Sequence, residues 1–171
     1  LTNGTRLDER LAPAIAGSGL DELRISLWAS DEQEYARNYG GCSPRFFQRV
    51  LDGARAVSRA RDAAGLETPR LVLHRPIDRD HFRRLEAMVR VARDAGCDAL
   101  SLSPLRPLSA GAVERSLTPA DVLEIDGILR RVGQLARDAG LACNDAVVRK
   151  RFRIGQEVWA ASPCYVGWLD V

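Results

Sequence analysis

The chain has 171 residues and a formal net charge of +2, and 46% of its residues are hydrophobic while 28% are charged. These values are typical of a globular domain, and the nearly balanced charges disfavour the clustered basic face of a nucleic-acid-binding protein. No apolar run approaches the ~20 residues that span a bilayer, and no signal segment starts the chain, so we expect a cytoplasmic protein with neither nucleic acid nor membrane as partner.

Both ends of the sequence read as interrupted. Leu1-Thr2-Asn3-Gly4 is typical of the end of a strand, and residues that are typical of a helix N-terminus follow within a few positions. The last residues, 163–168, lie inside a cysteine-centred pattern. We therefore expect the chain to be an excerpt from a longer protein.

The first half of the chain alternates between helical and strand patterns. A helix is predicted from Thr5 to Gly17, a strand over 22–28, and a polar loop from there to about Cys42. A long helix begins at the N-terminal pair Ser43-Pro44 and is closed by a glycine. Its predicted buried stripe consists of Phe47, Val50, Leu51, Ala54 and Val57.

The same alternation continues into the second half. A short strand over 71–73 ends at His74, and Asp80 is predicted to open the next helix, which Gly96 ends. The inward positions of that helix are Phe82, Leu85, Val89 and Ala92.

Another strand is predicted over 98–103. Thr118 and Asp121 then resemble a capping box, which starts a helix that ends at Gly140. The inward positions of this helix are Val122, Ile125, Leu129, Val132 and Leu135.

The repeating unit of strand, loop and helix predicts an α/β fold with a parallel sheet and helices outside. No Gly-x-Gly-x-x-Gly turn follows any strand, which favours a TIM-like (βα) barrel over a doubly wound sheet. A complete barrel needs about 250 residues, so we expect a partial barrel. We assign residues 1–145 to this partial barrel and residues 146–171 to a linker and the start of an extension.

Function is expected at the carboxyl ends of the strands, because the active sites of βα barrels form there. The residues at these ends are 2–4, 26–30, 74–76 and 103–105. They come from separate strands and would meet at one mouth of the barrel.

Several of these segments together resemble a known family. Leu-Thr-Asn-Gly before a helix, Arg-Ile-Ser-Leu-Trp-Ala-Ser over 24–30 with Glu34-Tyr35 after it, and Phe46-Phe47 at the start of a long helix resemble the second half of a radical S-adenosylmethionine (SAM) core domain. Pro163-Cys164-Tyr165 is similar to the first cysteine of a SPASM or twitch extension, which carries auxiliary iron–sulfur clusters. The resemblance implies that strands three to six of a six-unit partial barrel are present.

The resemblance also implies a SAM site at the strand ends. Ser26 matches a serine that contacts SAM, and His74 matches a polar group that faces the cofactor. Trp28 departs from the pattern, because the family usually has an acidic residue there. The implied cofactor-binding residues are Asn3, Gly4, Ser26, His74, Pro104 and Leu105.

Iron–sulfur chemistry would depend mainly on residues outside this chain. Cys164 matches the first ligand of an auxiliary cluster, whereas Cys42, Cys97 and Cys143 lack the three-cysteine spacing that binds the catalytic four-iron four-sulfur cluster. We expect Cys97 and Cys143 to be core residues and Cys42 to be an incidental loop thiol. The fragment alone should neither hold that cluster nor cleave SAM.

The resemblance implies an enzyme that reductively cleaves SAM to abstract a hydrogen atom from a peptide, metabolite or cofactor precursor. A flavodoxin or ferredoxin would supply the electron. One alternative is a barrel aldolase or epimerase that uses His74 as acid–base group, and another is a degenerate barrel that serves as a docking scaffold. His81, in the first turn of a helix, is expected to be solvated.

Overall fold

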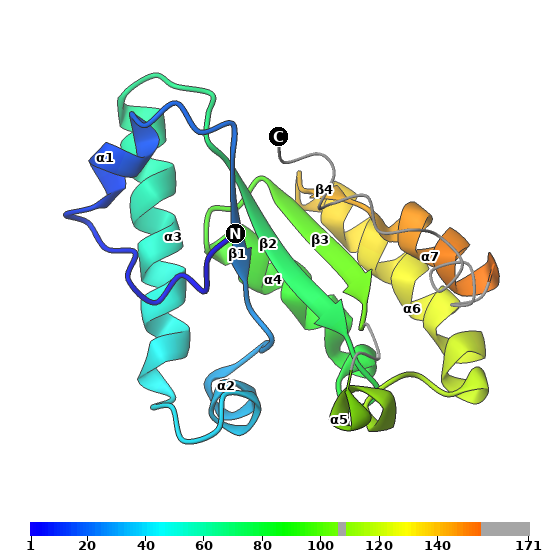
Figure 1. The fold of residues 1–171 in the computed structure, drawn as a ribbon. Helices are drawn as coiled ribbons and strands as arrows, with labels where there is room; N and C mark the ends of the chain where they lie inside the picture. Colours follow the sequence, from blue (N-terminus) through cyan, green and yellow to red (C-terminus); the bar gives the residue numbers. More distant parts are fainter. Residues whose placement is uncertain (106–108, 155–171) are drawn as a thin grey trace, which may run out of the picture.

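The computed structural model describes residues 1–105 and 109–154 (Figure 1). It shows an α/β fold with a four-stranded sheet in the order β1-β2-β3-β4, in which all neighbouring strands are parallel. The strands are β1 (Glu22–Ser26), β2 (Arg70–Ile77), β3 (Ala99–Pro104) and β4 (Ala142–Cys143). Thr2 forms a parallel bridge with Ile25 at the outer edge of β1, so the start of the chain does extend the sheet, as the sequence predicts.

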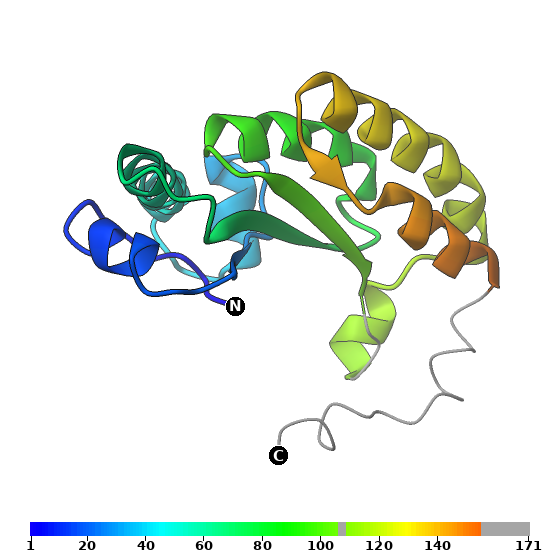
Figure 2. The ribbon, with the colours of Figure 1, turned by 90° about the horizontal axis from the view of Figure 1, so that it is seen from above.

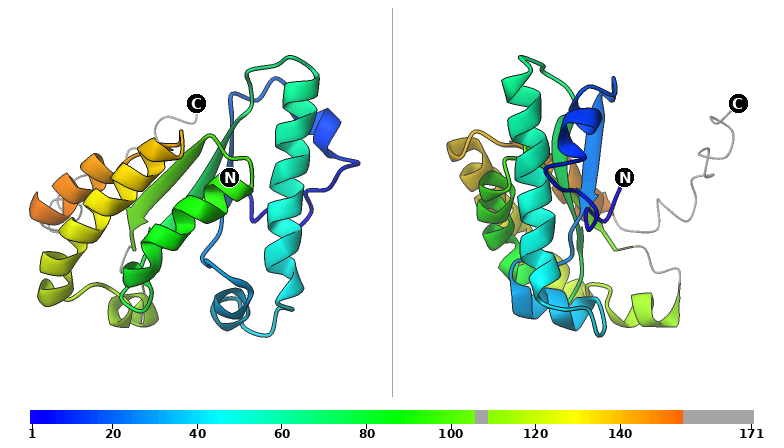
Figure 3. Two further views of the ribbon diagram at one scale, coloured as in Figure 1. Left: turned by 180° about the vertical axis from the view of Figure 1, so that it is seen from behind. Right: turned by 90° about the vertical axis from the view of Figure 1, so that its left-hand side faces the viewer.

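The helices lie mainly on one side of the sheet. Figures 2 and 3 show α3, α4 and α6 against one face. The short helix α5 lies toward the other side but beyond the carboxyl end of β3, so no helix of the described residues lies across that face. The helical elements are α1 (Ala12–Ala16), α2 (Glu32–Asn38), α3 (Arg45–Ala63), the 3₁₀ turn η1 (Phe82–Arg84), α4 (Leu85–Asp94), α5 (Ala110–Glu114), α6 (Pro119–Asp138) and α7 (Asp145–Ile154).

Strand alternation divides the side chains between the two faces. Apolar side chains from the three longer strands point to the helix side and join one core: Ile25, Leu27, Leu71, Leu73, Ile77, Leu100 and Leu102. The residues between them point to the opposite side, which we call the uncovered face. It carries the polar side chains of Arg24, Ser26, His74, Ser101 and Ser103.

The predicted helix stripes form the other half of the core. All five predicted positions of α3 are buried, as are the four predicted for the next helix, of which Phe82 lies in η1 and the other three in α4. In α6 the stripe runs through Ile125, Leu129, Val132 and Ala136, whereas Leu135 is 41% exposed. The prediction for Leu135 is wrong because spacings of four, three and four residues keep a stripe on one helix face, and residue 135 lies beside that face.

Several elements differ from prediction. The first helix begins at Ala12 rather than near Thr5, because the Asp8 side chain accepts a hydrogen bond from the Leu11 N–H (2.8 Å) and holds a turn before it. The expected polar loop contains α2, whose N-cap Asp31 accepts from the Glu34 N–H (2.7 Å).

β2 continues three residues past His74, to Ile77. Asp80 does not open a helix, because the η1 turn comes first and α4 begins only at Leu85. The capping box of α6, in contrast, is confirmed: Thr118 and Asp121 each bind the backbone N–H of the other.

The sheet also has a fourth strand that the sequence pattern does not predict. β4 pairs with β3 through Ala142 and Cys143. Directly after it, the Asn144 side chain accepts from the Leu102 N–H (2.8 Å) and donates to the Leu102 carbonyl (2.9 Å). A side-chain amide thus continues the ladder where the backbone turns into α7.

α7 packs with the rest of the fold. Val148 and Phe152 are buried in the same core as α6. Residues 146–153 therefore lie against the α/β body, although the sequence assigns them to a linker; residues 155–171 are outside the described part. Within the described residues, every helix is too short or too polar to cross a lipid bilayer.

Candidate functional site

The polar groups of the uncovered face meet at His74. The register places Ser26 of β1 and Ser101 of β3 beside it on either side. The His74 Nε2 and Ser103 Oγ atoms lie 3.0 Å apart and share a hydrogen bond. The His74 Nδ1 atom is buried and has no hydrogen-bond partner within the described part of the chain.

The environment favours a neutral imidazole. Burial lowers the pKa of His74, and the positive charge of Arg24 lowers it further. A neutral ring has one donor nitrogen and one acceptor nitrogen. His74 therefore carries one buried polar atom, Nδ1, that has no partner within the described residues.

The other residues predicted to bind the cofactor lie near the same end of the sheet, in different settings. The Asn3 Oδ1 atom accepts hydrogen bonds from the Thr5 N–H (3.1 Å) and hydroxyl (2.9 Å), so this side chain is already engaged. Gly4 is buried with φ of 74°, and a Cβ there would meet Val50 and Ile25 of the helix-side core. The sequence predicts that Gly4 lines the cofactor side of the sheet. Because a Cβ at Gly4 would point into the helix-side core, only its backbone could do so.

Pro104 and Leu105 end β3 at the same edge. Pro104 is in register with Ile77, and the Leu105 N–H donates to the Ile77 carbonyl (3.1 Å). Both residues are half-buried. Strand alternation places the Pro104 side chain on the helix side with Ile77, whereas Ser26 and His74 face the other side of the sheet. Cys164 lies outside the described residues.

A second polar group, the rim network, lies beneath this end of the sheet on the helix side. It consists of Glu34, Arg75, Asp78, His81 and Arg115. Arg75 Nη2 donates to Glu34 Oε1 at 2.7 Å, and their side chains are 2% and 0% exposed. Burial alone would raise the pKa of Glu34, but hydrogen bonds from Ser30 and the charge of Arg75 outweigh it and lower the pKa below its ordinary value.

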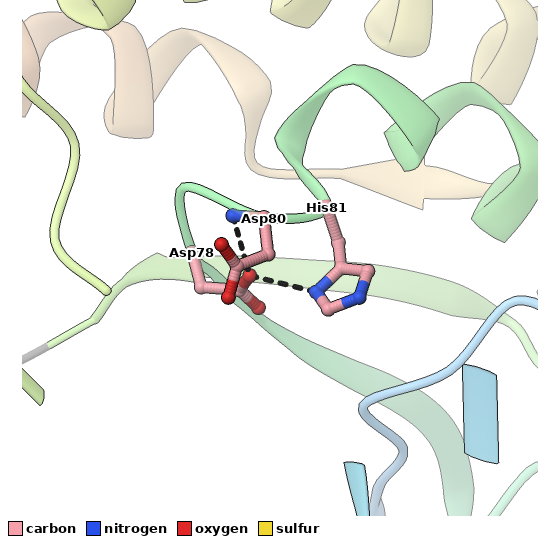
Figure 4. Close-up of side chains that lie close together, drawn as sticks. All are labelled: Asp78, Asp80 and His81. Atoms are coloured by element: carbon pink, nitrogen blue, oxygen red, sulfur yellow. Dashed lines mark hydrogen bonds and ion pairs between the residues drawn. The ribbon is translucent and has the colours of Figure 1, made fainter. Parts of the chain in front are cut away.

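Asp78 joins the rim network to the loop after β2 (Figure 4). Its Oδ1 accepts hydrogen bonds from His81 Nδ1 (2.8 Å) and from the Asp80 N–H (3.1 Å). The His81 side chain is 12% exposed, so the expectation of a solvated histidine is wrong. The loop after β2 turns back on itself, which places the His81 ring next to the buried carboxylate of Asp78, three residues earlier in the chain.

Asp78, Asp80 and His81 also offer ligand atoms within 4.8 Å of one another. However, the guanidinium of Arg115 lies 3.5 Å from Asp78 Oδ2 and 3.4 Å from Asp80 Oδ2. A metal ion between these carboxylates would be repelled by that charge at short range. We therefore interpret the group as an ion-pair network.

The described cysteines do not form a cluster site. Cys42 is exposed, and Cys143 is half-buried beside the core. Cys97 is buried, which raises the pKa of its thiol to about 12. Burial confirms the core position of Cys97, and no three cysteines of the described residues approach one another as metal ligands.

Sequence reasoning missed the rim network. Glu34, Arg75 and Arg115 come from three distant segments, and no local pattern connects them. One local signal existed: Asp78 and His81 are three residues apart directly after a strand, a spacing that allows a side chain to reach back.

Polar side chains from three strands face the same side of the sheet, and such groups are the kind that fix the orientation of a small polar ligand. The rim network would hold the loops around that site in place. No family model matches the sequence, and no curated protein matches it.

Proposed function

We propose that this chain is part of a radical SAM enzyme and that the uncovered face around Ser26 and His74 forms part of the SAM site. The observation that carries the proposal is the placement of Ser26 and His74 as register partners, beside an unpaired His74 Nδ1, on the face that no described helix covers. The segments quoted for the family resemblance supply Ser26 and His74 at these same positions.

The topology supports a partial barrel. Doubly wound sheets reverse their strand order and carry helices on both faces. Here the strands follow in chain order without reversal, and α3, α4 and α6 share one face. In a barrel arc of this kind the uncovered face is the inner one, and ligands bind at its carboxyl end.

The residues present fit SAM. This cofactor has a zwitterionic methionine end, ribose hydroxyls and an adenine ring. Ser26 and His74 offer polar atoms for the first two, and Leu105, half-buried directly after β3, offers apolar surface for the ring. On reductive cleavage SAM supplies the radical that removes a hydrogen atom from the substrate, and the protein orients it and excludes water.

The iron–sulfur part of the proposal lies outside the described residues. We place the ligands of the catalytic four-iron four-sulfur cluster in a part of the protein beyond this chain, and we propose Cys164 as a ligand of an auxiliary cluster. The substrate would be a peptide, metabolite or cofactor precursor. A cytoplasmic flavodoxin or ferredoxin would donate the electron.

The test uses the protein at its full encoded length, purified without oxygen. Iron and sulfide are assayed, and SAM binding is measured by equilibrium dialysis. We expect bound iron, and we expect Ser26→Ala and His74→Ala to weaken SAM binding at least about fivefold, the loss of roughly one hydrogen bond each. Ser18→Ala, at the exposed end of α1, is the matched control for Ser26→Ala. Cys164→Ser should lower the iron content.

A colourless protein without iron that does not bind SAM would overturn the proposal. The second candidate is an epimerase or aldolase that uses the neutral His74 as its base, and it would survive that result. A Schiff-base mechanism is not favoured, because the only lysine of the sequence, Lys150, is exposed on α7. Retention of a protein partner with neither iron nor turnover would point to a docking scaffold instead.

A further inference from the structure

Ser103 controls the environment of one ring nitrogen of His74. The two residues lie on neighbouring strands and share the uncovered face, and Ser103 Oγ is 3.0 Å from Nε2. The Nδ1 atom on the other edge of the ring has no partner within the described part of the chain. The hydrogen bond of the Ser103 hydroxyl therefore determines whether Nδ1 is a hydrogen-bond donor or an acceptor.

A neutral imidazole carries its proton on one nitrogen, and the partner of the other nitrogen selects which. A serine hydroxyl can either donate or accept, so geometry alone allows both tautomers. The burial of Nδ1 decides between them, because unpaired buried N–H donors are rarer in folded proteins than unpaired buried acceptors. The proton is thus best placed on Nε2.

We propose that Ser103 is a positioning residue of the SAM site: its Oγ accepts the Nε2–H of His74 and fixes the tautomer whose bare Nδ1 accepts a hydrogen bond from a hydroxyl or ammonium group of the bound ligand. This inference rests on the proposed function, since SAM provides both groups, the hydroxyls on its ribose and the ammonium on its methionine end. Arg24, which disfavours a protonated ring, keeps the Nδ1 lone pair available.

The tautomer is tested without any ligand. Long-range proton–nitrogen correlation NMR on the full chain distinguishes bare from protonated ring nitrogens, and the sequence has only two histidines, so His81→Gln assigns both. We expect Nδ1 of His74 to be bare and Nε2 to be protonated. Ser103→Ala should give a mixture of tautomers, and Ser103→Thr should restore the single one.

Ser101→Ala is the matched control for the tautomer. Ser101 lies on the same strand and face, but its side chain makes no hydrogen bond among the described residues. A protonated Nδ1 in the unmodified chain, or an unchanged His74 spectrum in Ser103→Ala, overturns the role of Ser103. Because the unmodified chain is itself informative, a variant that fails to fold does not remove the test.

The ligand contact is tested with two probes in equilibrium dialysis. S-adenosylhomocysteine carries the ribose hydroxyls and the ammonium, whereas methylthioadenosine carries only the hydroxyls. Ser103→Ala should weaken binding about fivefold to tenfold, as expected for one hydrogen bond. A loss with both probes assigns the contact to a hydroxyl, and a loss with S-adenosylhomocysteine alone assigns it to the ammonium.

The two proposals fail in different ways. Binding of neither probe overturns the proposed function, and with it the ligand contact, while the NMR result still decides whether Ser103 sets the tautomer. Probe binding that Ser103→Ala leaves unchanged overturns the contact and leaves the proposed function standing.

Discussion

The His74 ring is held with a pKa below its ordinary value of 6.5 because burial and the charge of Arg24 disfavour its protonated form. As pH falls, the unfolded chain takes up this proton before the folded chain does. The stabilisation is therefore present above the unfolded pKa and is lost as pH falls through the folded pKa.

We expect the free energy of unfolding to decrease as pH falls below the ordinary histidine pKa of 6.5, and to decrease less in His74→Gln. Urea denaturation at a series of pH values measures both slopes. His81→Gln, in which His74 is intact, is the control. Equal slopes for His74→Gln and the unmodified chain would contradict the expectation.

At Gly53, α3 lies against the backbone of the segment before α1. A Cβ at this position would lie 2.5 Å from both Cβ and the carbonyl oxygen of Leu7, and backbone cannot move aside cheaply. We expect Gly53→Ala to destabilise the chain by about 1–3 kcal/mol through overpacking.

The control for Gly53→Ala is Gly127→Ala in the interior of α6. A Cβ there meets only the end of the Arg131 side chain, at 3.8 Å. Because alanine is the better helix former, this variant should gain about 0.5–1 kcal/mol. Thermal denaturation measures whether each variant is more or less stable than the unmodified chain. A loss of stability of similar size in the two variants would refute the packing argument.

At the level of elements, α2 is attached to β2 by the buried pair of Glu34 and Arg75. Neither side chain is more than 2% exposed, so removal of one charge leaves the other without full compensation. We expect Glu34→Gln to cost about 3–5 kcal/mol in urea denaturation, and to increase hydrogen exchange in α2. The loss of stability is expected because the Arg75 guanidinium would stay buried without its charged partner.

The matched control removes an exposed carboxylate from the ion pair of Glu9 and Arg59, whose side chains are 86% and 64% exposed. Glu9→Gln should cost less than about 1 kcal/mol, because solvent screens such pairs. A small effect of Glu34→Gln, comparable to the control, would show that α2 is held by other contacts.

The elements that the sequence predicts well are those with local causes. The long helix α3 has its apolar stripe and closing glycine within one segment, and α6 has its capping box in four consecutive residues. α2 could not be found in this way. Its seven residues lack an apolar stripe, and the contact that anchors it comes from Arg75, 41 residues away.

The same distinction applies to the candidate site. Strand patterns alone could place Ser26 at the carboxyl end of β1 and His74 on a neighbouring parallel strand, because a βαβ connection makes the two strands parallel. They do not show that β2 continues to Ile77, three residues past His74. The hydrogen bond between Ser103 and His74 depends on the orientation of the imidazole ring. The burial of His81 depends on the path of the loop after β2. Strand periodicity carries no information on either.

At the scale of the whole molecule, α7 belongs to the core. Phe152 is 7% exposed and packs in the same apolar cluster as α6. Phe152→Ala should therefore cost about 3–5 kcal/mol and lower the stability of the sheet as well as the helix. Val147→Ala, on the side of α7 that is 52% exposed, should change stability by less than about 0.5 kcal/mol.

Circular dichroism and intrinsic fluorescence monitor the two variants during denaturation. A single shifted transition in Phe152→Ala is the expected result. If a domain boundary at residues 145 and 146 separated α7 from the sheet, the transition of the sheet would stay in place instead.

The two edges of the sheet differ in how many backbone groups they leave free to pair with a further strand, and the Asn144 amide is one cause of this difference. On the β3 side, a side chain occupies the Leu102 peptide group, and the chain then bends away as a helix, so a new strand finds few backbone groups to join. On the β1 side, Thr2 alone among the described residues pairs with the outer edge of the five-residue strand, which leaves most of that edge available within the described part of the chain. A further strand would therefore pair more readily at the β1 border than at the β4 border, and it would widen the uncovered face on the Ser26 side of His74.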